Sequence, residues 1–113
     1  MTLEPRPHLN FSAMPWIIAY DIENDKLRTK AANRILEDGL IRLQKSVFVG
    51  DPKESVLRDL MLWLEKNTET VPGSSDQIIL LPCTQRQLET AVFYGAPPAD
   101  WKEMLHPPNT LII

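Results

Sequence analysis

Asp21 is the residue of this chain whose type and position best suit chemistry. It closes the apolar run that starts at Trp16, which predicts a short buried strand, and it precedes the polar start of a helix. Ligand sites of α/β sheets commonly lie just past the carboxyl ends of strands, so an acid here is a candidate metal ligand. An acid between a strand and a helix more often caps backbone amides, but Asn24 and Asp25 are better placed for that task. Asp21 is therefore left for another role.

Basic side chains gather in one window of the sequence. Residues 26–45 include six basic and two acidic residues, a net charge of +4, whereas residues 51–113 include five basic and nine acidic residues, a net charge of −4. A chain of net charge −3 can therefore present a basic face to phosphate, with a salt-sensitive affinity. Lysine and arginine at helical spacing more commonly form a solvated helix face, and composition alone favours that interpretation.

The helix after Asp21 is predicted from its caps and its periodicity. Asn24 or Asp25 caps its N-terminus, and Gly39 ends it as a left-handed cap. One face is apolar, at Leu27, Ala31 and Ile35. Another carries basic residues at i, i+4 and i+8, namely Lys26, Lys30 and Arg34.

Residues 41–49 alternate apolar and polar side chains and predict an extended run that bends into two strands near Lys45. After this run, Asp51, Pro52 and Glu54 predict an N-cap, a proline at the first helical position and an acid at the third, a capping-box arrangement. The helix that follows is expected to bury Val56, Leu57, Leu60, Met61 and Leu64.

The rest of the chain predicts a loop at 67–76, a strand at 77–81 stopped by Pro82, and a further strand at 91–95. The resulting order, βαββαβ with an extra strand, is that of an α+β ferredoxin-like sandwich. Two helices then cover one face of an antiparallel sheet and leave the other face uncovered.

The chain resembles the Cas-two family of CRISPR-associated proteins, the non-integrase partners in the complex that inserts new spacers into a CRISPR array. The resemblance rests on the Tyr20-Asp21 strand end, the Asp-Lys-x-Arg helix start and the Arg-x-Gln-x-Ser-Val-Phe hairpin that begins at Arg42. It covers residues 15–66 well and 77–95 loosely. It implies a homodimer that pairs sheet to sheet through the uncovered face.

The resemblance also implies a site. The matching acid of each protomer, here Asp21 beside Tyr20, is expected near the dimer axis, where two such carboxylates hold Mg²⁺ for endonuclease activity. Ser46 and Phe48 are expected to flank and shape this site, with Phe48 equally suited to plain sheet packing. Together with the charge pattern, the resemblance gives five expected nucleic-acid-binding residues: Lys26, Arg28, Lys30, Arg34 and Arg42.

Two functions of different classes follow from the resemblance. One is a metal-dependent endonuclease that acts on RNA or duplex DNA. The other is a scaffold that bridges an integrase of the Cas-one kind and holds the middle of a prespacer duplex without hydrolysis. A related toxin-type ribonuclease of the same fold, acting without an integrase, is a third alternative.

The composition indicates in which compartment the protein is found and argues against disulfide bonds and a membrane span. The single cysteine, Cys83, excludes an internal disulfide framework and fits a reducing compartment. No segment approaches the roughly 18 apolar residues of a membrane span, and the N-terminus does not resemble a signal peptide. A cytoplasmic protein with no membrane partner is expected. His8 and His106 lie in the two tails, so neither supplies an obvious base near Asp21.

The two ends are expected to differ in role. Residues 1–14 are expected to be a non-essential extension, with translation starting at Met1 or Met14, and residues 15–95 form the ferredoxin-like domain. In the tail, residues 96–113, a short helical turn is predicted to present Trp101, Met104 and Leu105 together. The β-prone end at 109–113 is predicted to add to a sheet edge, either of the integrase or of the other protomer.

Overall fold

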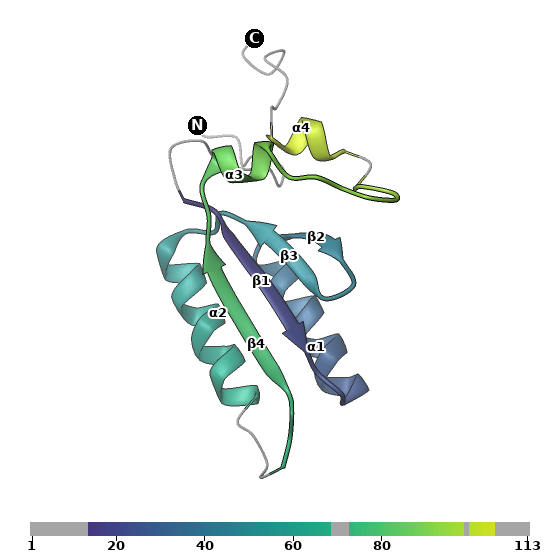
Figure 1. Ribbon diagram of the computed structural model, residues 1–113. Helices are drawn as coiled ribbons and strands as arrows, with labels where there is room; N and C mark the ends of the chain where they lie inside the picture. Colours follow the sequence, from purple (N-terminus) through teal and green to yellow (C-terminus); the bar gives the residue numbers. More distant parts are fainter. Residues whose placement is uncertain (1–13, 69–72, 99, 106–113) are drawn as a thin grey trace.

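The computed structural model describes residues 14–68, 73–98 and 100–105. The first six elements follow the predicted order βαββαβ, and two further short helices come after them (Figure 1). The elements are β1 (Trp16–Asp21), α1 (Asp25–Glu37), β2 (Ile41–Gln44), β3 (Val47–Gly50), α2 (Glu54–Asn67), β4 (Gln77–Pro82), α3 (Gln85–Glu89) and α4 (Trp101–Leu105).

The four strands of the described residues form one antiparallel sheet in the order β2-β3-β1-β4. β1 lies at its centre, with Ile18 opposite Phe48 of β3 on one side and opposite Leu80 of β4 on the other. The ladder between β1 and β4 ends at the pair Asp21 and Gln77. This strand order with helices on one face confirms the predicted α+β ferredoxin-like architecture.

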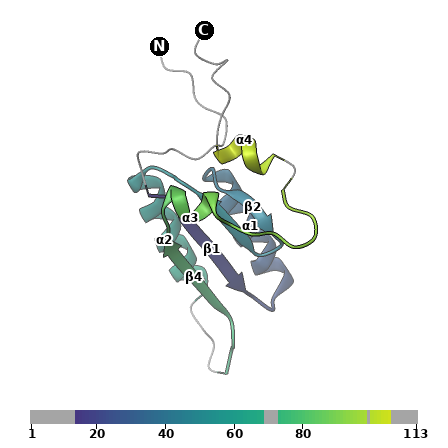
Figure 2. The same ribbon diagram turned by 45° about the horizontal axis from the view of Figure 1, so that its top comes forward.

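α1 and α2 cover one face of the sheet, as Figures 1 and 2 show. Every second residue of β1 points into this layer, because successive side chains of a strand alternate between its faces. Ile18 and Tyr20 are buried there against Phe48 of β3, and Leu60 is buried on α2. The core of this layer consists of Ile18, Tyr20, Ile22, Ala31, Ala32, Ile35, Leu40, Phe48, Leu60 and Leu64.

The predicted caps of α1 are confirmed. The side chain of Asn24 accepts a hydrogen bond from the backbone N–H of Leu27 at 2.9 Å. At the other end Gly39 has a φ of 95°, a conformation that costs glycine little. The N–H groups of Gly39 and Leu40 donate to the carbonyls of Leu36 and Ile35, a Schellman arrangement that ends the helix and turns the chain into β2.

The capping box predicted for α2 is wrong. α2 begins at Glu54, its N-cap residue is Lys53, and the Lys53 side chain makes no cap hydrogen bond. Pro52 therefore lies before the helix, and the Glu54 side chain pairs with Arg58 one turn on, at 3.0 Å, instead of reaching back. The apolar face is also narrower than predicted: Leu57, Leu60 and Leu64 are buried, Val56 is half-buried, and Met61 is 43% exposed.

The strand predicted at 91–95 is not formed in this chain. α3 occupies the preceding residues, started by a capping box in which Thr84 and Gln87 exchange side-chain to backbone hydrogen bonds at 3.1 and 2.8 Å. Val92 and Tyr94 are 73% and 95% exposed, whereas Phe93 turns inward. Ala91 and Gly95 are exposed as well, so only Phe93 faces inward, and the described residues give this segment no neighbouring strand.

The segment from Cys83 to Leu105 builds a second, smaller core on the opposite face of the sheet. Its members are Val49, Cys83, Leu88, Trp101, Met104 and Leu105, packed against Ile17, Ile41, Leu43 and Phe93. The predicted helical turn is confirmed, since Trp101, Met104 and Leu105 are all buried. The face expected to be uncovered is thus covered at one end, and Ile79 and Leu81 remain about half exposed on the rest. The predicted strand at 109–113 lies outside the described residues.

Cys83 is a packing residue in this second core. It is 8% exposed, and burial raises the pKa of its thiol, which disfavours the nucleophilic thiolate at neutral pH. Within the described part of the chain, no helix is long and apolar enough to cross a membrane.

Candidate functional site

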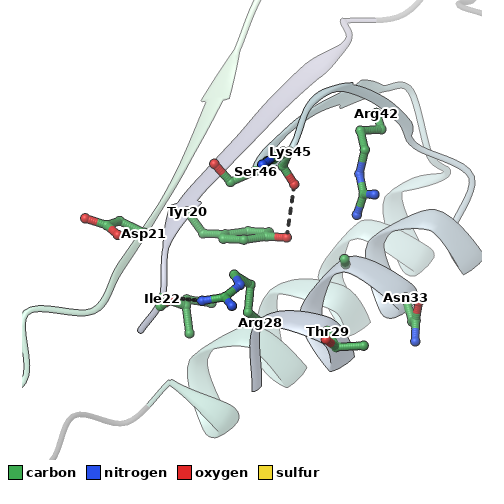
Figure 3. A pocket seen from close by; sticks show the side chains of 10 residues that line it. Tyr20, Asp21, Ile22, Arg28, Thr29, Asn33, Arg42, Lys45 and Ser46 are labelled. Atoms are coloured by element: carbon green, nitrogen blue, oxygen red, sulfur yellow. Dashed lines mark hydrogen bonds between the residues drawn. The ribbon is translucent and has the colours of Figure 1, made fainter. Parts of the chain in front are cut away.

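Asp21 lies at the end of β1 on the face of the sheet opposite α1 and α2. It pairs with Gln77 in the ladder, and its exposed carboxylate points away from the basic side chains of α1 and β2 (Figure 3). The ladder places Ala19 and Ile79 on the same face, next to Asp21. Within the described residues, no group of three histidine, cysteine or acidic side chains gathers as a metal site. The described part of one chain therefore does not form a metal site of three such ligands around Asp21.

Tyr20 points to the other face, toward α1. It is 6% exposed, its ring lies 5.8 Å from that of Phe48, and its hydroxyl donates to the carbonyl of Lys45 at 3.5 Å (Figure 3). Its backbone N–H also donates to the carbonyl of Ser46 at 3.0 Å. Tyr20 thus braces the turn between β2 and β3, and the structure does not bring it together with Asp21.

An open hollow of about 510 Å³ lies between the end of β1, α1 and the β2–β3 hairpin. Its lining combines three cationic side chains, three hydroxyls and one amide, with the Asp21 carboxylate turned away at the rim (Figure 3). Such a set of donors suits a phosphate oxygen. The lining residues are Tyr20, Asp21, Ile22, Arg28, Thr29, Ala32, Asn33, Arg42, Lys45 and Ser46.

Two of the arginines predicted to bind nucleic acid have partners within the chain. Arg28 donates through Nη1 to the carbonyls of Ile22 and Glu23, at 2.9 and 3.2 Å, and its Nη2 pairs with Asp25. These bonds hold Arg28 against the turn between β1 and α1.

Arg34 lies at the interface between α1 and α2. Its Nε donates to Asp38 at 2.9 Å, and its guanidinium lies 5.7 Å from the ring centre of Trp63. Both partners of the ion pair are largely covered, with 28% and 17% of their side-chain surface exposed. Arg34 thus links the two helices, and its charge is offset inside the fold.

The remaining predicted cations are more accessible. Arg42 is exposed, and its guanidinium lies 5.1 Å from the ring centre of Phe48, which supports it from below. Lys26 and Lys30 are exposed on α1 and form no salt bridge with any described residue. Phe48 itself is fully buried, so it shapes the hollow by packing under Arg42 and Tyr20.

Sequence reasoning missed two residues of the hollow, Thr29 and Asn33, and did not count Lys45 among the binding residues. Thr29 and Asn33 are one helical turn apart on α1, so they share the face that meets the hairpin. Their spacing is readable from the sequence, but only the packing of α1 against the hairpin turns that face into part of a site.

Comparison with known proteins agrees with this fold. The family described as CRISPR associated protein Cas2 has a model that matches residues 14–91, more than half of the chain. This chain belongs to the Cas2 family. The Tyr20-Asp21 strand end, α1 and the hairpin of the hollow all lie within the matched residues.

Relatives of the family come from distant organisms. The chain is 37% identical over 88 residues to "CRISPR-associated endoribonuclease Cas2 2" of Pyrobaculum aerophilum, a match that covers 78% of this chain and 93% of the relative. A protein of the same printed name from Synechocystis is 31% identical over 100 residues, covering 87% and 97%.

Two further matches are a fusion protein and a solved structure. A "CRISPR-associated endonuclease Cas1/endonuclease Cas2 fusion" of Thermoproteus tenax is 27% identical over 90 residues, which cover 80% of this chain and 33% of the fusion. Among solved structures, the hypothetical protein TT1823 of Thermus thermophilus matches with a TM-score of 0.59 and 27% identity, covering 75% of this chain and 94% of that one.

Proposed function

We propose that this Cas2-family chain acts in CRISPR adaptation as a cytoplasmic homodimer that bridges a Cas-one-type integrase and binds nucleic acid, with Mg²⁺-dependent cleavage at Asp21. The observation that carries the binding role is the hollow between α1 and the hairpin, where Arg42 and Lys45 meet the polar side chains of Thr29, Asn33 and Ser46. These residues come from two elements and project donors into one space. Backbone phosphates of DNA or RNA fit such a surface without regard to sequence.

The homodimer is supported by apolar surface on the face opposite α1 and α2. Ile79 and Leu81 are about half exposed there, and β4 is an edge strand of the sheet. In the segment 91–95, Val92 and Tyr94 expose apolar surface, with Tyr94 almost fully exposed, so this segment suits addition to the sheet of a second copy. Pairing of two sheets would cover these side chains.

Asp21 fits Mg²⁺ in such a dimer. Mg²⁺ keeps several waters and is often held by one or two carboxylates with substrate phosphate completing its shell. Asp21 lies on the face proposed to pair, so two protomers would each contribute an Asp21 carboxylate. A bound Mg²⁺ would lower the pKa of a water and offset charge that develops on the phosphodiester. The role of Asp21 is to hold the ion, and that of the hollow is to hold the nucleic-acid backbone.

A scaffold without hydrolysis is the second candidate. It is favoured by the small set of candidate catalytic groups at Asp21, because no group of three or more histidine, cysteine or acidic side chains gathers there within the described residues. The printed names of the relatives favour cleavage of RNA. The natural fusion of related sequences to a Cas1 endonuclease favours an integrase partner over the stand-alone, toxin-type ribonuclease.

The binding role is tested by removing three charges at the hollow and on the adjoining face of α1. Replacing Lys30, Arg42 and Lys45 by glutamine together should weaken duplex binding. Each lost phosphate contact should lower the log-log slope of affinity against salt by about 0.9, hence roughly 2.7 for three contacts. The measurement is a duplex titration at several salt concentrations.

A matched control removes three exposed lysines elsewhere. The control variant changes Lys53, Lys66 and Lys102 to glutamine, which alters the net charge by the same amount. Lys53 directly precedes α2, Lys66 lies on α2 and Lys102 lies on α4. This control should keep the wild-type salt slope. If instead both triple variants behave alike, the duplex does not lie on the hollow.

A further inference from the structure

We propose that Arg28 and Asp76 are positioning residues for Asp21: they hold the turn after Asp21 from its two sides and so fix the carboxylate. This role rests on the proposed cleavage at Asp21. It also separates Arg28 from the residues expected to bind phosphate, because its guanidinium is bonded to two backbone carbonyls and to the Asp25 carboxylate of its own chain.

On the helix side, Arg28 reaches back over the turn. Its Nη1 donates to the carbonyl of Ile22 at 2.9 Å, drawn as a dashed line in Figure 3, and to that of Glu23 at 3.2 Å. Its Nη2 pairs with Asp25, and its backbone N–H donates to the carbonyl of Asn24 at 2.9 Å. One guanidinium thereby ties two carbonyls of the turn to the first turn of α1.

On the sheet side, Asp76 continues the link where the ladder stops. The last pair between β1 and β4 is Asp21 with Gln77, and Asp76 directly precedes Gln77. Its Oδ1 accepts a hydrogen bond from the backbone N–H of Glu23 at 3.0 Å, and its own N–H donates to Oγ of Ser74 at 3.2 Å. The Asp76 side chain, just before the start of β4, thus holds the turn beyond the last ladder pair.

The two clamps act on a turn of three residues. Ile22, its first residue, is 3% exposed and anchored in the core, and Asp21, just before it, belongs to the last ladder pair with Gln77. Arg28 and Asp76 hold the backbone that follows. Catalytic groups must be held within a fraction of an ångström, and a misplacement of about 1 Å can cost about 100-fold in rate. A loosened turn should therefore lower turnover without changing how nucleic acid binds.

The test compares Asp76→Ala with Asp76→Asn in the full chain. Kinetics of Mg²⁺-dependent cleavage and backbone amide exchange at Glu23, measured by NMR, are the two readouts. For Asp76→Ala we expect about a tenfold fall in kcat with KM within about twofold. Exchange at Glu23 should become about tenfold faster because its acceptor is gone. Asp76→Asn keeps an oxygen acceptor and should stay near wild type in both readouts.

Arg28→Ala tests the hydrogen bonds that hold the turn on the helix side. It also replaces Asp76→Ala as the test if that variant fails to fold. It should lower kcat similarly. The salt slope of duplex binding should stay at the wild-type value, whereas an Arg42→Ala variant should lower it by about 0.9. Asp59→Ala, an exposed acid on α2, is the control and should change neither readout.

Three outcomes would overturn the proposal. Wild-type kcat in a folded Asp76→Ala variant would show that the clamp does not position Asp21. Unchanged exchange at Glu23 in that variant would show that the clamp is absent. A wild-type protein that binds duplex but cleaves nothing would remove the proposed cleavage and this role with it, while exchange at Glu23 would still report whether Asp76 holds the turn.

Discussion

Replacing Asp21 by alanine is expected to abolish Mg²⁺-dependent cleavage and leave the fold intact. The side chain is exposed and contributes no core volume, so the melting temperature should stay within error. The proposed ion contributes several kcal/mol of transition-state stabilisation, so the rate should fall by about 100-fold or more. Duplex affinity should stay close to wild type, because the hollow of Arg42 and Lys45 faces the other way. Cleavage of RNA and of duplex DNA over a Mg²⁺ titration measures this.

Glu23→Ala is the matched control for this variant. Glu23 is an exposed acid two residues further along, and the turn uses its backbone groups, not its carboxylate. This variant should cleave at close to the wild-type rate. Cleavage by Asp21→Ala at the wild-type rate would place the reaction elsewhere or assign it to a contaminant.

Replacing Phe48 by alanine is expected to have the largest effect on stability. Phe48 is fully buried at the centre of the sheet, where its ring packs against Tyr20 and lies under the guanidinium of Arg42. Truncation of a buried phenylalanine costs about 3–5 kcal/mol, a large part of the roughly 5–15 kcal/mol that stabilises a domain. The free energy of unfolding in urea, with its slope, measures the loss.

Phe93→Ala is the comparison. Phe93 is half-buried at the edge of the second core, where it meets Trp101 edge to face at 5.3 Å, so its loss should cost less than that of Phe48. A loss below about 1 kcal/mol for Phe48→Ala would mean that the layer between sheet and helices rearranges around the gap.

Much of the fold could be predicted because its signals are local. Asn24 and Gly39 mark the ends of α1 through backbone chemistry that any sequence of this kind must satisfy. The start of α2 was predicted less well, since Asp51, Pro52 and Glu54 fit a capping box that the chain does not use. A true capping box stands at Thr84 and Gln87, with the same spacing, and was overlooked.

The segment 91–95 shows why a strand predicted from one sequence can be absent from the structure of one chain. Its β-branched and aromatic run at 92–94 is typical of a strand, but a sequence pattern alone does not supply a neighbouring strand to pair with. Within the described residues the edge of β4 carries no further strand, and Val92 and Tyr94 stay exposed. Strand formation there depends on a partner that a single sequence does not contain.

Some features of the candidate site could likewise be predicted from the sequence, and others could not. The opposite orientation of Tyr20 and Asp21 follows from the two-residue period of a strand and could be predicted from the sequence. The internal partners of Arg28 and Arg34 could not, because charge counts do not reveal which cations face backbone carbonyls or a neighbouring helix. Arg42 lies at the hollow, where its guanidinium is over the ring of the buried Phe48.

The central claim, a homodimer that joins an integrase to nucleic acid, is tested most directly by size-exclusion chromatography with light scattering. The chain is run alone, with a Cas-one-type integrase, and with the integrase and a short duplex. We predict a dimer alone and a single larger complex that holds all three components when they are mixed. Elution of this chain apart from both partners, under conditions where the integrase and duplex are intact, would contradict the account.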